Sequence, residues 1–124
     1  GFARAASLLG GREGPAPTAF ICSSTLQALG VIRAATAAGL QVGSDISIIA
    51  HDDVLPHLRS EHFSPPLTVT RSPIREAGTA LAEMMVQRIG GVEPRKLQRI
   101  VQADLIVRGS TGAVPESGGE AWLQ

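Results

Sequence analysis

Apolar and polar positions alternate along the chain in blocks that predict short buried strands separated by helices. Two short apolar runs with β-branched residues, at 18–22 and 46–50, each indicate a buried strand. Between them lies an alanine-rich stretch at 26–38, preceded by Ser23-Ser24-Thr25, whose hydroxyls suit a helix N-cap. A strand, a helix and a strand at this spacing form a βαβ unit. We therefore expect an α/β fold with a parallel sheet flanked by helices and a right-handed crossover.

The segments on either side continue this pattern. Residues 1–9 read as a short amphipathic helix and residues 67–70 as an extended segment. Ser72 and Pro73 suit the N-cap and first residue of a further helix, along which apolar residues recur at helical spacing. These apolar residues are Ile74, Ala77, Leu81, Met84, Met85 and Ile89. Between residues 97 and 107 the apolar residues favour odd positions, which predicts a final strand.

Length and composition narrow the class of protein. The 124 residues are enough for one domain at most, and 44% hydrophobic against 18% charged residues excludes a disordered segment. Basic and acidic residues number 11 each, so the chain exerts no net attraction on nucleic acid. No apolar run is long enough to span a bilayer. The single cysteine, Cys22, lies in an apolar run and is expected to be a small buried hydrophobe, which fits a reducing cytoplasm.

The two ends of the sequence carry separate expectations. The helical pattern of residues 1–9 is present from the first residue, and there is no initiator methionine. We therefore expect the chain to be a fragment of a longer protein. Residues 113–124 are expected to form a flexible tail because they contain Gly, Pro and Glu but no periodic apolar pattern.

Polar residues follow both confident strands at the point where each strand ends. Ser24 and Thr25 follow the first strand, and His51, Asp52 and Asp53 end the second. Ligands of open parallel sheets bind beyond the carboxyl ends of the strands, so both clusters should face one crevice. A carboxylate accepts hydrogen bonds from two neighbouring hydroxyls, and a hydroxyl can donate or accept. The combination suits a sugar or another polyol better than a phosphate, which would favour Lys, Arg or a glycine-rich loop.

Simpler roles stay open for the same residues. Ser24 and Thr25 can merely cap the helix, and Asp52 or Asp53 can cap a short helical turn at 54–59. Metal binding by His51, Asp52, Asp53 and His57 matches no closed zinc pattern. The sequence has no nucleophile elbow around a serine and no Gly-x-Gly-x-x-Gly motif. We therefore predict no catalytic residue, no metal and no cofactor.

Six short motifs occur in an order that is specific even though no single motif is. They are Pro17-Thr18-Ala19-Phe20 with Ala28-Leu29-Gly30, Gly43-Ser44-Asp45-Ile46-Ser47-Ile48-Ile49, His51-Asp52-Asp53, Pro65-Pro66-Leu67-Thr68-Val69, Pro73-Ile74 with Gly78, and Leu105-Ile106-Val107-Arg108-Gly109-Ser110-Thr111. Together they resemble the effector-sensing domain of LacI/GalR-family transcription regulators, over residues 1 to about 111.

The resemblance implies a periplasmic-binding-protein-like fold, with two α/β subdomains and a small-molecule effector in the cleft between them. Residues 1–112 would form mostly the C-terminal subdomain, with 67–96 crossing towards an N-terminal subdomain that this sequence largely lacks. It also implies a cytoplasmic homodimer whose affinity for operator DNA changes when the effector binds. The DNA would be contacted only through an N-terminal headpiece that is absent here.

The resemblance also assigns roles to the polar cluster. Asp52 matches the family's effector-contacting aspartate, and Asp53 is its neighbour. Ser24 falls where the family often has a ligand-binding Asn, and Thr25 where it often has Asp. A serine reaches less far than Asn and lacks the paired donor and acceptor of an amide. His51 replaces an aromatic residue and adds an imidazole, which can donate and accept hydrogen bonds.

Assembly is the last expectation from the resemblance. A dimer surface is implied on the helix at 26–38, especially Leu29, Ile32 and Arg33, and on the loop around His62 and Phe63. We also expect the apolar stripe of the helix after Pro73 to pack against a second copy, on the reasoning that the first two helices already cover the sheet.

The main alternative is a periplasmic sugar-binding protein of a transporter, which shares the fold. The Pro65-Pro66-Leu67-Thr68 segment and the Arg108–Thr111 ending favour the regulator. An enzyme on a similar scaffold is disfavoured, because no nucleophile, metal set or cofactor motif is present.

Overall fold

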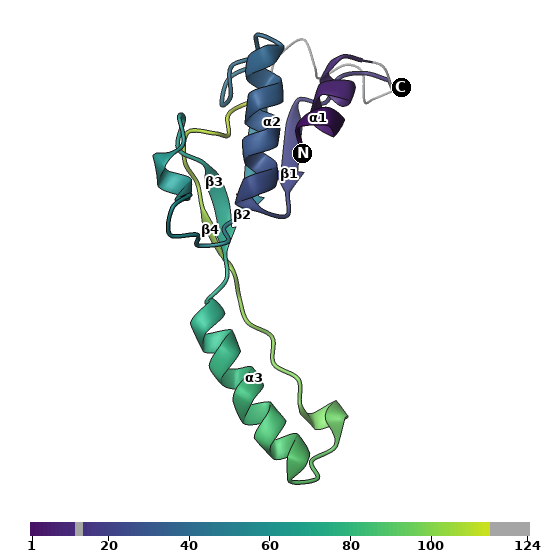
Figure 1. The fold of residues 1–124 in the computed structure, drawn as a ribbon, viewed down its shortest axis with the longest axis vertical. Coiled ribbons are helices and arrows are strands. Elements are labelled where there is room, and N and C mark those ends of the chain that lie inside the picture. Colours follow the sequence, from purple (N-terminus) through teal and green to yellow (C-terminus); the bar gives the residue numbers. More distant parts are fainter. Residues whose placement is uncertain (12–13, 115–124) are drawn as a thin grey trace. The chain divides into compact units, whose positions relative to one another are not determined.

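The computed structural model describes residues 1–11 and 14–114 (Figure 1). The chain divides into two compact units. The first contains residues 1–70 and is completed by the chain from residue 105 onward, and the second contains residues 71–104. The polar cluster predicted to bind a ligand lies in the first unit.

The first unit begins with the predicted βαβ arrangement. Helix α1 (Phe2–Leu9) precedes strand β1 (Ala19–Cys22), helix α2 (Thr25–Ala37) and strand β2 (Ser47–His51). Strands β1 and β2 are parallel, with Ile21 opposite Ile49. The prediction of two parallel strands joined by a helix is therefore confirmed.

Two further strands extend the sheet. Strand β3 (Thr68–Arg71) is parallel to β2, and β4 (Asp104–Ile106) occupies the far edge, giving the order β1-β2-β3-β4. A 3₁₀ turn, η1 (Ser60–His62), lies between β2 and β3. The sequence predicted a short helical turn at 54–59. The structure has a hydrogen-bonded turn there, in which the N–H of Leu58 donates to the carbonyl of Leu55 at 3.3 Å, but no regular helix. Val54 does not belong to a right-handed turn, because its backbone is left-handed, with φ of 51°.

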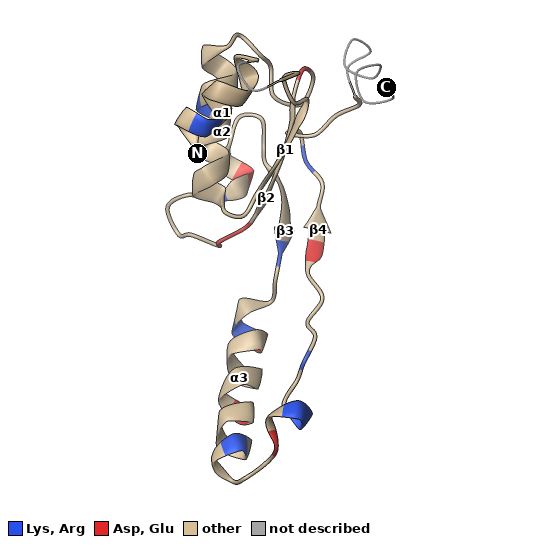
Figure 2. Ribbon diagram, turned by 90° about the vertical axis from the view of Figure 1, so that its right-hand side faces the viewer, with Lys and Arg blue, Asp and Glu red and all other residues tan. Residues whose placement is uncertain are grey.

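The core lies between the two helices α1 and α2 and the sheet. It consists of Ala5, Cys22, Ala28, Val31, Ala34, Ile48, Ala50, Leu67 and Val69. Helices α1 and α2 lie on the same side of β1 and β2 (Figure 2). They approach closely at Gly30, where an added Cβ would lie 2.7 Å from the backbone nitrogen of Phe2. The glycine therefore sets the distance between the two helices.

Strand β1 is less buried than the sequence predicted. Cys22 is buried, but Ile21 on the opposite face of the strand is 89% exposed. The reason is that β1 is an edge strand and the two helices lie on one side of it. The expectation that these helices cover both faces of the sheet is therefore wrong.

The segment that follows β4 packs against the amino ends of β2 and β3. The buried Ser110 hydroxyl donates to the carbonyl of Ile48 at 2.6 Å and accepts from the backbone N–H of Thr68 at 2.7 Å. Gly43, with φ of 93°, lies against Gly109, and a Cβ at residue 43 would be 2.2 Å from the Gly109 carbonyl oxygen. These contacts explain why a glycine suits position 43 and a hydroxyl side chain suits position 110.

The second unit contains α3 (Ile74–Ile89), the turn η2 (Pro94–Lys96) and an extended return (Figure 1). Helix α3 was predicted, but Ser72 does not cap it, since Pro73 is the N-cap and no side chain bonds there. Of the apolar residues that the sequence placed at helical spacing along α3, Leu81, Met85 and Ile89 are exposed. In the part of the chain that the structure describes, no helix is long and apolar enough to cross a membrane.

The final strand is shorter than predicted. Strand pairing covers only Asp104–Ile106 of the segment 97–107. Alternating polarity alone does not make a strand without a neighbour to pair with, and residues 97–103 belong to a unit built on a helix. Arg99 there donates to the Glu76 carboxylate of α3 at 2.9 Å. Of the tail predicted at 113–124, residues 113 and 114 lie in neither helix nor strand, and residues 115–124 lie outside the described part.

Candidate effector site at the carboxyl ends of the strands

The five residues predicted to bind an effector lie together at the carboxyl ends of β1 and β2. Ser24 and Thr25 follow β1, while His51 ends β2 and is followed by Asp52 and Asp53. The two ends are joined directly, because the backbone N–H of Thr25 donates to the Asp53 carboxylate at 2.9 Å. Strand direction was thus sufficient to predict the cluster.

Thr25 is the link between the two strand ends. Its side chain is fully buried, its hydroxyl donates to the carbonyl of His51 at 3.4 Å, and the same oxygen accepts from the N–H of Asp53 at 3.4 Å. Because both capacities of the hydroxyl are used inside the protein, Thr25 shapes the site rather than facing a ligand.

Ser24 has the capping role that the sequence left open. Its hydroxyl oxygen accepts from the backbone N–H of Gln27 at 3.2 Å. The Gln27 side chain folds back and accepts from the Ser23 hydroxyl at 3.0 Å. A hydroxyl that accepts a hydrogen bond can still donate its own hydrogen, and Ser24 is only half-buried. Capping and ligand binding are therefore compatible at this residue.

His51 pairs with a residue that sequence reasoning missed. Its Nδ1 shares a hydrogen bond of 3.2 Å with the Thr70 hydroxyl on β3, the residue opposite it in the sheet. The sequence contained Thr70 in a predicted extended segment, but did not reveal that this segment pairs with β2. This contact orients the half-buried imidazole at the strand end.

Asp52 differs from the other members of the cluster because its side chain is 1% exposed. One carboxylate oxygen accepts from the N–H of Val54 at 2.8 Å, and the other from the Ser60 hydroxyl at 2.8 Å. Arg108 donates to that same hydroxyl at 3.1 Å. Ser60 and Arg108 were not predicted as site residues, although Arg108 was visible in the closing motif.

The accessible chemistry of the edge comes from Ser24, His51 and Asp53, which are each half-buried. They offer a hydroxyl, an imidazole and a carboxylate, a set that can donate to and accept from a polyol. Among the described residues, no group of three or more His, Cys, Asp and Glu side chains is placed to hold a metal ion.

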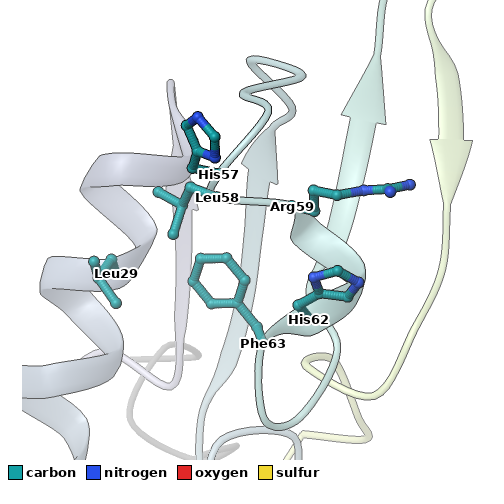
Figure 3. Close-up of a pocket in the computed structure, with 6 residues that line it drawn as sticks. All are labelled: Leu29, His57, Leu58, Arg59, His62 and Phe63. Carbon is teal, nitrogen blue, oxygen red and sulfur yellow. The ribbon is translucent and has the colours of Figure 1, made fainter.

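A separate hollow of about 320 Å³ lies between α2 and the loop that contains η1 (Figure 3). Its lining consists of Leu29, His57, Leu58, Arg59, His62 and Phe63. Three of the five residues predicted at a dimer surface are therefore brought together. The other two lie elsewhere: Ile32 packs against the core, and the Arg33 guanidinium lies 5.7 Å from the centroid of the Phe2 ring.

Comparison with known proteins agrees with this architecture. The family described as a periplasmic binding protein-like domain matches residues 2–111. The transcriptional regulator AglR of Rhizobium meliloti is 52% identical over 100 residues, which are 81% of this chain and 28% of AglR.

Two solved structures are also similar. The transcriptional regulator CelR in complex with cellobiose has a TM-score of 0.72 at 28% identity, over 88% of this chain and 32% of CelR. The lac repressor dimer bound to operator and the anti-inducer ONPF has a TM-score of 0.69 at 31% identity, over 90% of this chain and 37% of the repressor.

These matches define the class of the protein as a periplasmic binding protein-like domain. Within this class the chain belongs to the LacI family, as part of its effector-binding domain. The chain spans between 28% and 37% of the length of these three proteins. All three are transcription regulators.

Proposed function

We propose that this chain is the effector-sensing and dimer-forming part of a cytoplasmic, LacI-type DNA-binding regulator, with a sugar as its effector. The observation that carries the proposal is the half-buried set of Ser24, His51 and Asp53 above the buried Asp52. The cellobiose bound by the similar regulator CelR supports this class of ligand.

The roles differ among the residues. Asp53 accepts hydrogen bonds from sugar hydroxyls with the lone pairs that the N–H of Thr25 leaves available. His51 and Ser24 supply further donors and acceptors, while Asp52 lies beneath them and fixes the following loop. Two adjacent carboxylates repel a phosphate group, which favours a neutral sugar.

The proposal assigns residues 1–112 mostly to the C-terminal subdomain, with 67–96 crossing towards the N-terminal one. The division of the chain into separate units at residues 71 and 104 supports this assignment. Operator DNA is contacted by a separate headpiece, since the chain has no net charge. The dimer forms across the hollow that contains Leu29 and Phe63, and the dimeric state of the similar lac repressor supports it.

An NMR titration of this chain with cellobiose and lactose tests the sugar site. We expect amide shifts at Ser24, His51 and Asp53 at millimolar sugar, because one wall of a two-walled cleft binds weakly. Inorganic phosphate should give no such shifts. Asp53→Asn should weaken sugar binding about tenfold or more, since it removes a charged acceptor, while Ser44→Ala, an exposed hydroxyl in a distant turn, should not. Equal binding by Asp53→Asn and the unmodified chain, or shifts elsewhere only, would refute the site.

A further inference from the structure

A single carboxylate closes the loop between β2 and η1 at both of its ends. Asp52 accepts from the N–H of Val54 where the loop begins and from the Ser60 hydroxyl where it ends, both at 2.8 Å. Asp52 is 1% exposed and Ser60 is fully buried. His62 and Phe63, two and three residues after Ser60, line the hollow (Figure 3).

Arg108 fixes the direction of the Ser60 hydroxyl. Its Nη1 donates to the Ser60 oxygen at 3.1 Å and to the carbonyl of Leu67 at 2.8 Å. The Ser60 oxygen therefore accepts from a cation, and its one hydrogen is directed at the nearest acceptor, the Asp52 carboxylate. Hydrogen bonds of this kind, buried and to charged partners, are the strong ones.

The loop held by these bonds contains a strained residue. Val54 has φ of 51°, a backbone conformation that a β-branched residue rarely adopts. Such strain persists only where the surroundings hold it in place. Weakening either bond to Asp52 would remove part of what holds Val54 in this conformation, and the loop would then change shape.

We propose that Ser60 is a positioning residue that transmits the state of the Asp52 carboxylate to the part of the loop carrying Phe63. This rests on the proposed function, in which the sugar binds Asp53 and Asp52 lies beneath it. A sugar bound to Asp53 displaces the backbone that joins Asp53 to Asp52 and Val54, and so changes the hydrogen bonds that Asp52 accepts from Val54 and Ser60. Sugar binding therefore loosens the loop at Ser60 and alters the hollow around Phe63.

Amide hydrogen exchange of the chain, read by NMR, tests the link. The N–H of His62 bonds to the carbonyl of Arg59 at 3.0 Å and reports on the loop. Asp52→Asn keeps the shape but loses one acceptor oxygen, and we expect it to speed exchange at His62 about tenfold or more, as should Ser60→Ala. The double variant should exchange no faster than the faster single variant, because both remove the same link.

A matched control separates this link from general destabilisation. Val31→Ala removes buried side-chain volume from α2 without touching the network, and should leave exchange at His62 unchanged. Unchanged exchange at His62 in Asp52→Asn, or effects of Asp52→Asn and Ser60→Ala that simply add, would overturn the proposal.

Cellobiose distinguishes a failure of the link from a failure of the sugar site. In the unmodified chain, cellobiose should change exchange at His62, and Ser60→Ala should abolish that change while amide shifts at Ser24 persist. If cellobiose changes exchange at His62 equally in both, the link is wrong and the sugar site stands. If cellobiose causes no shift at the strand ends, the sugar site is wrong, and the variants alone still decide the link.

Discussion

The backbone N–H of Thr25 donates a hydrogen bond to the Asp53 carboxylate, residues that are separated by a helix and a strand. This bond satisfies one of the donors that the first turn of α2 leaves unpaired. It also holds the start of α2 against the end of β2, so that Ser24 and His51 stay on the same edge of the sheet. Local capping and assembly of the site are therefore one interaction.

Removing this cap should cost measurable stability. We expect Asp53→Ala to lower the free energy of unfolding by about 0.5–2 kcal/mol, as seen for lost helix caps. Urea unfolding followed by circular dichroism measures the change. Asp104→Ala, at an exposed carboxylate of β4, is the matched control and should have little effect. Equal stabilities of the two variants would show that the Thr25 contact contributes nothing.

Position 54 should reverse the usual order of alanine and glycine. Because Val54 has a left-handed backbone, Val54→Gly should be more stable than Val54→Ala by about 1 kcal/mol. At a position with ordinary backbone angles the alanine variant would be the more stable of the two. Paired urea titrations decide this, and a more stable alanine variant would mean that residue 54 is not left-handed in solution.

The dimer surface can be tested on α2. Leu29→Glu places a charge in the hollow beside Phe63, and we expect the dimer dissociation constant to rise about tenfold or more. Leu26→Glu changes an exposed leucine of the same helix that does not line the hollow, and should leave the constant unchanged. Sedimentation equilibrium measures both. An unaltered dissociation constant for Leu29→Glu would place the contact elsewhere.

Burial raises the pKa of the Cys22 thiol above its ordinary value of 9.0. The folded protein therefore favours the neutral thiol, and the stability that this gives is present below pH 9.0 and lost as the pH rises through the raised pKa. Because the thiolate is the reactive form, we expect Cys22 to react with Ellman's reagent much more slowly in the folded chain than in urea. Equal rates in both states would contradict its burial.

The sequence predicted the arrangement that depends on strand direction and missed what depends on neighbours. The polar cluster followed from parallel strands alone, so Ser24 and Asp53 were found. The pairing of His51 with Thr70 required the order of the strands, which periodicity does not encode. The exposure of Ile21 required knowing which sheet face the helices cover, because an apolar strand at an edge and one in the centre look alike in sequence.

The same exposure bears on the stripe of α3. Packing of this stripe against a second copy was expected because the first two helices were thought to cover the sheet. With Ile21 89% exposed, that premise does not hold, and the partner of Leu81 and Met85 stays a prediction. Leu81→Glu should weaken self-association if the stripe lies between copies, and leave it unchanged otherwise.

Ser110 has a consequence for how the chain folds. The bonds from its hydroxyl complete the junction of β2 and β3, yet residues 71–104 are synthesised in between. During translation, the sheet of the first unit therefore cannot be completed until the whole of the second unit has been synthesised. Contacts that close so long an excursion form late, because the entropy of loop closure must be overcome before they stabilise anything. Until then the amino ends of these strands are open to other chains, so the newly made protein should be most prone to aggregate before residue 110 is in place.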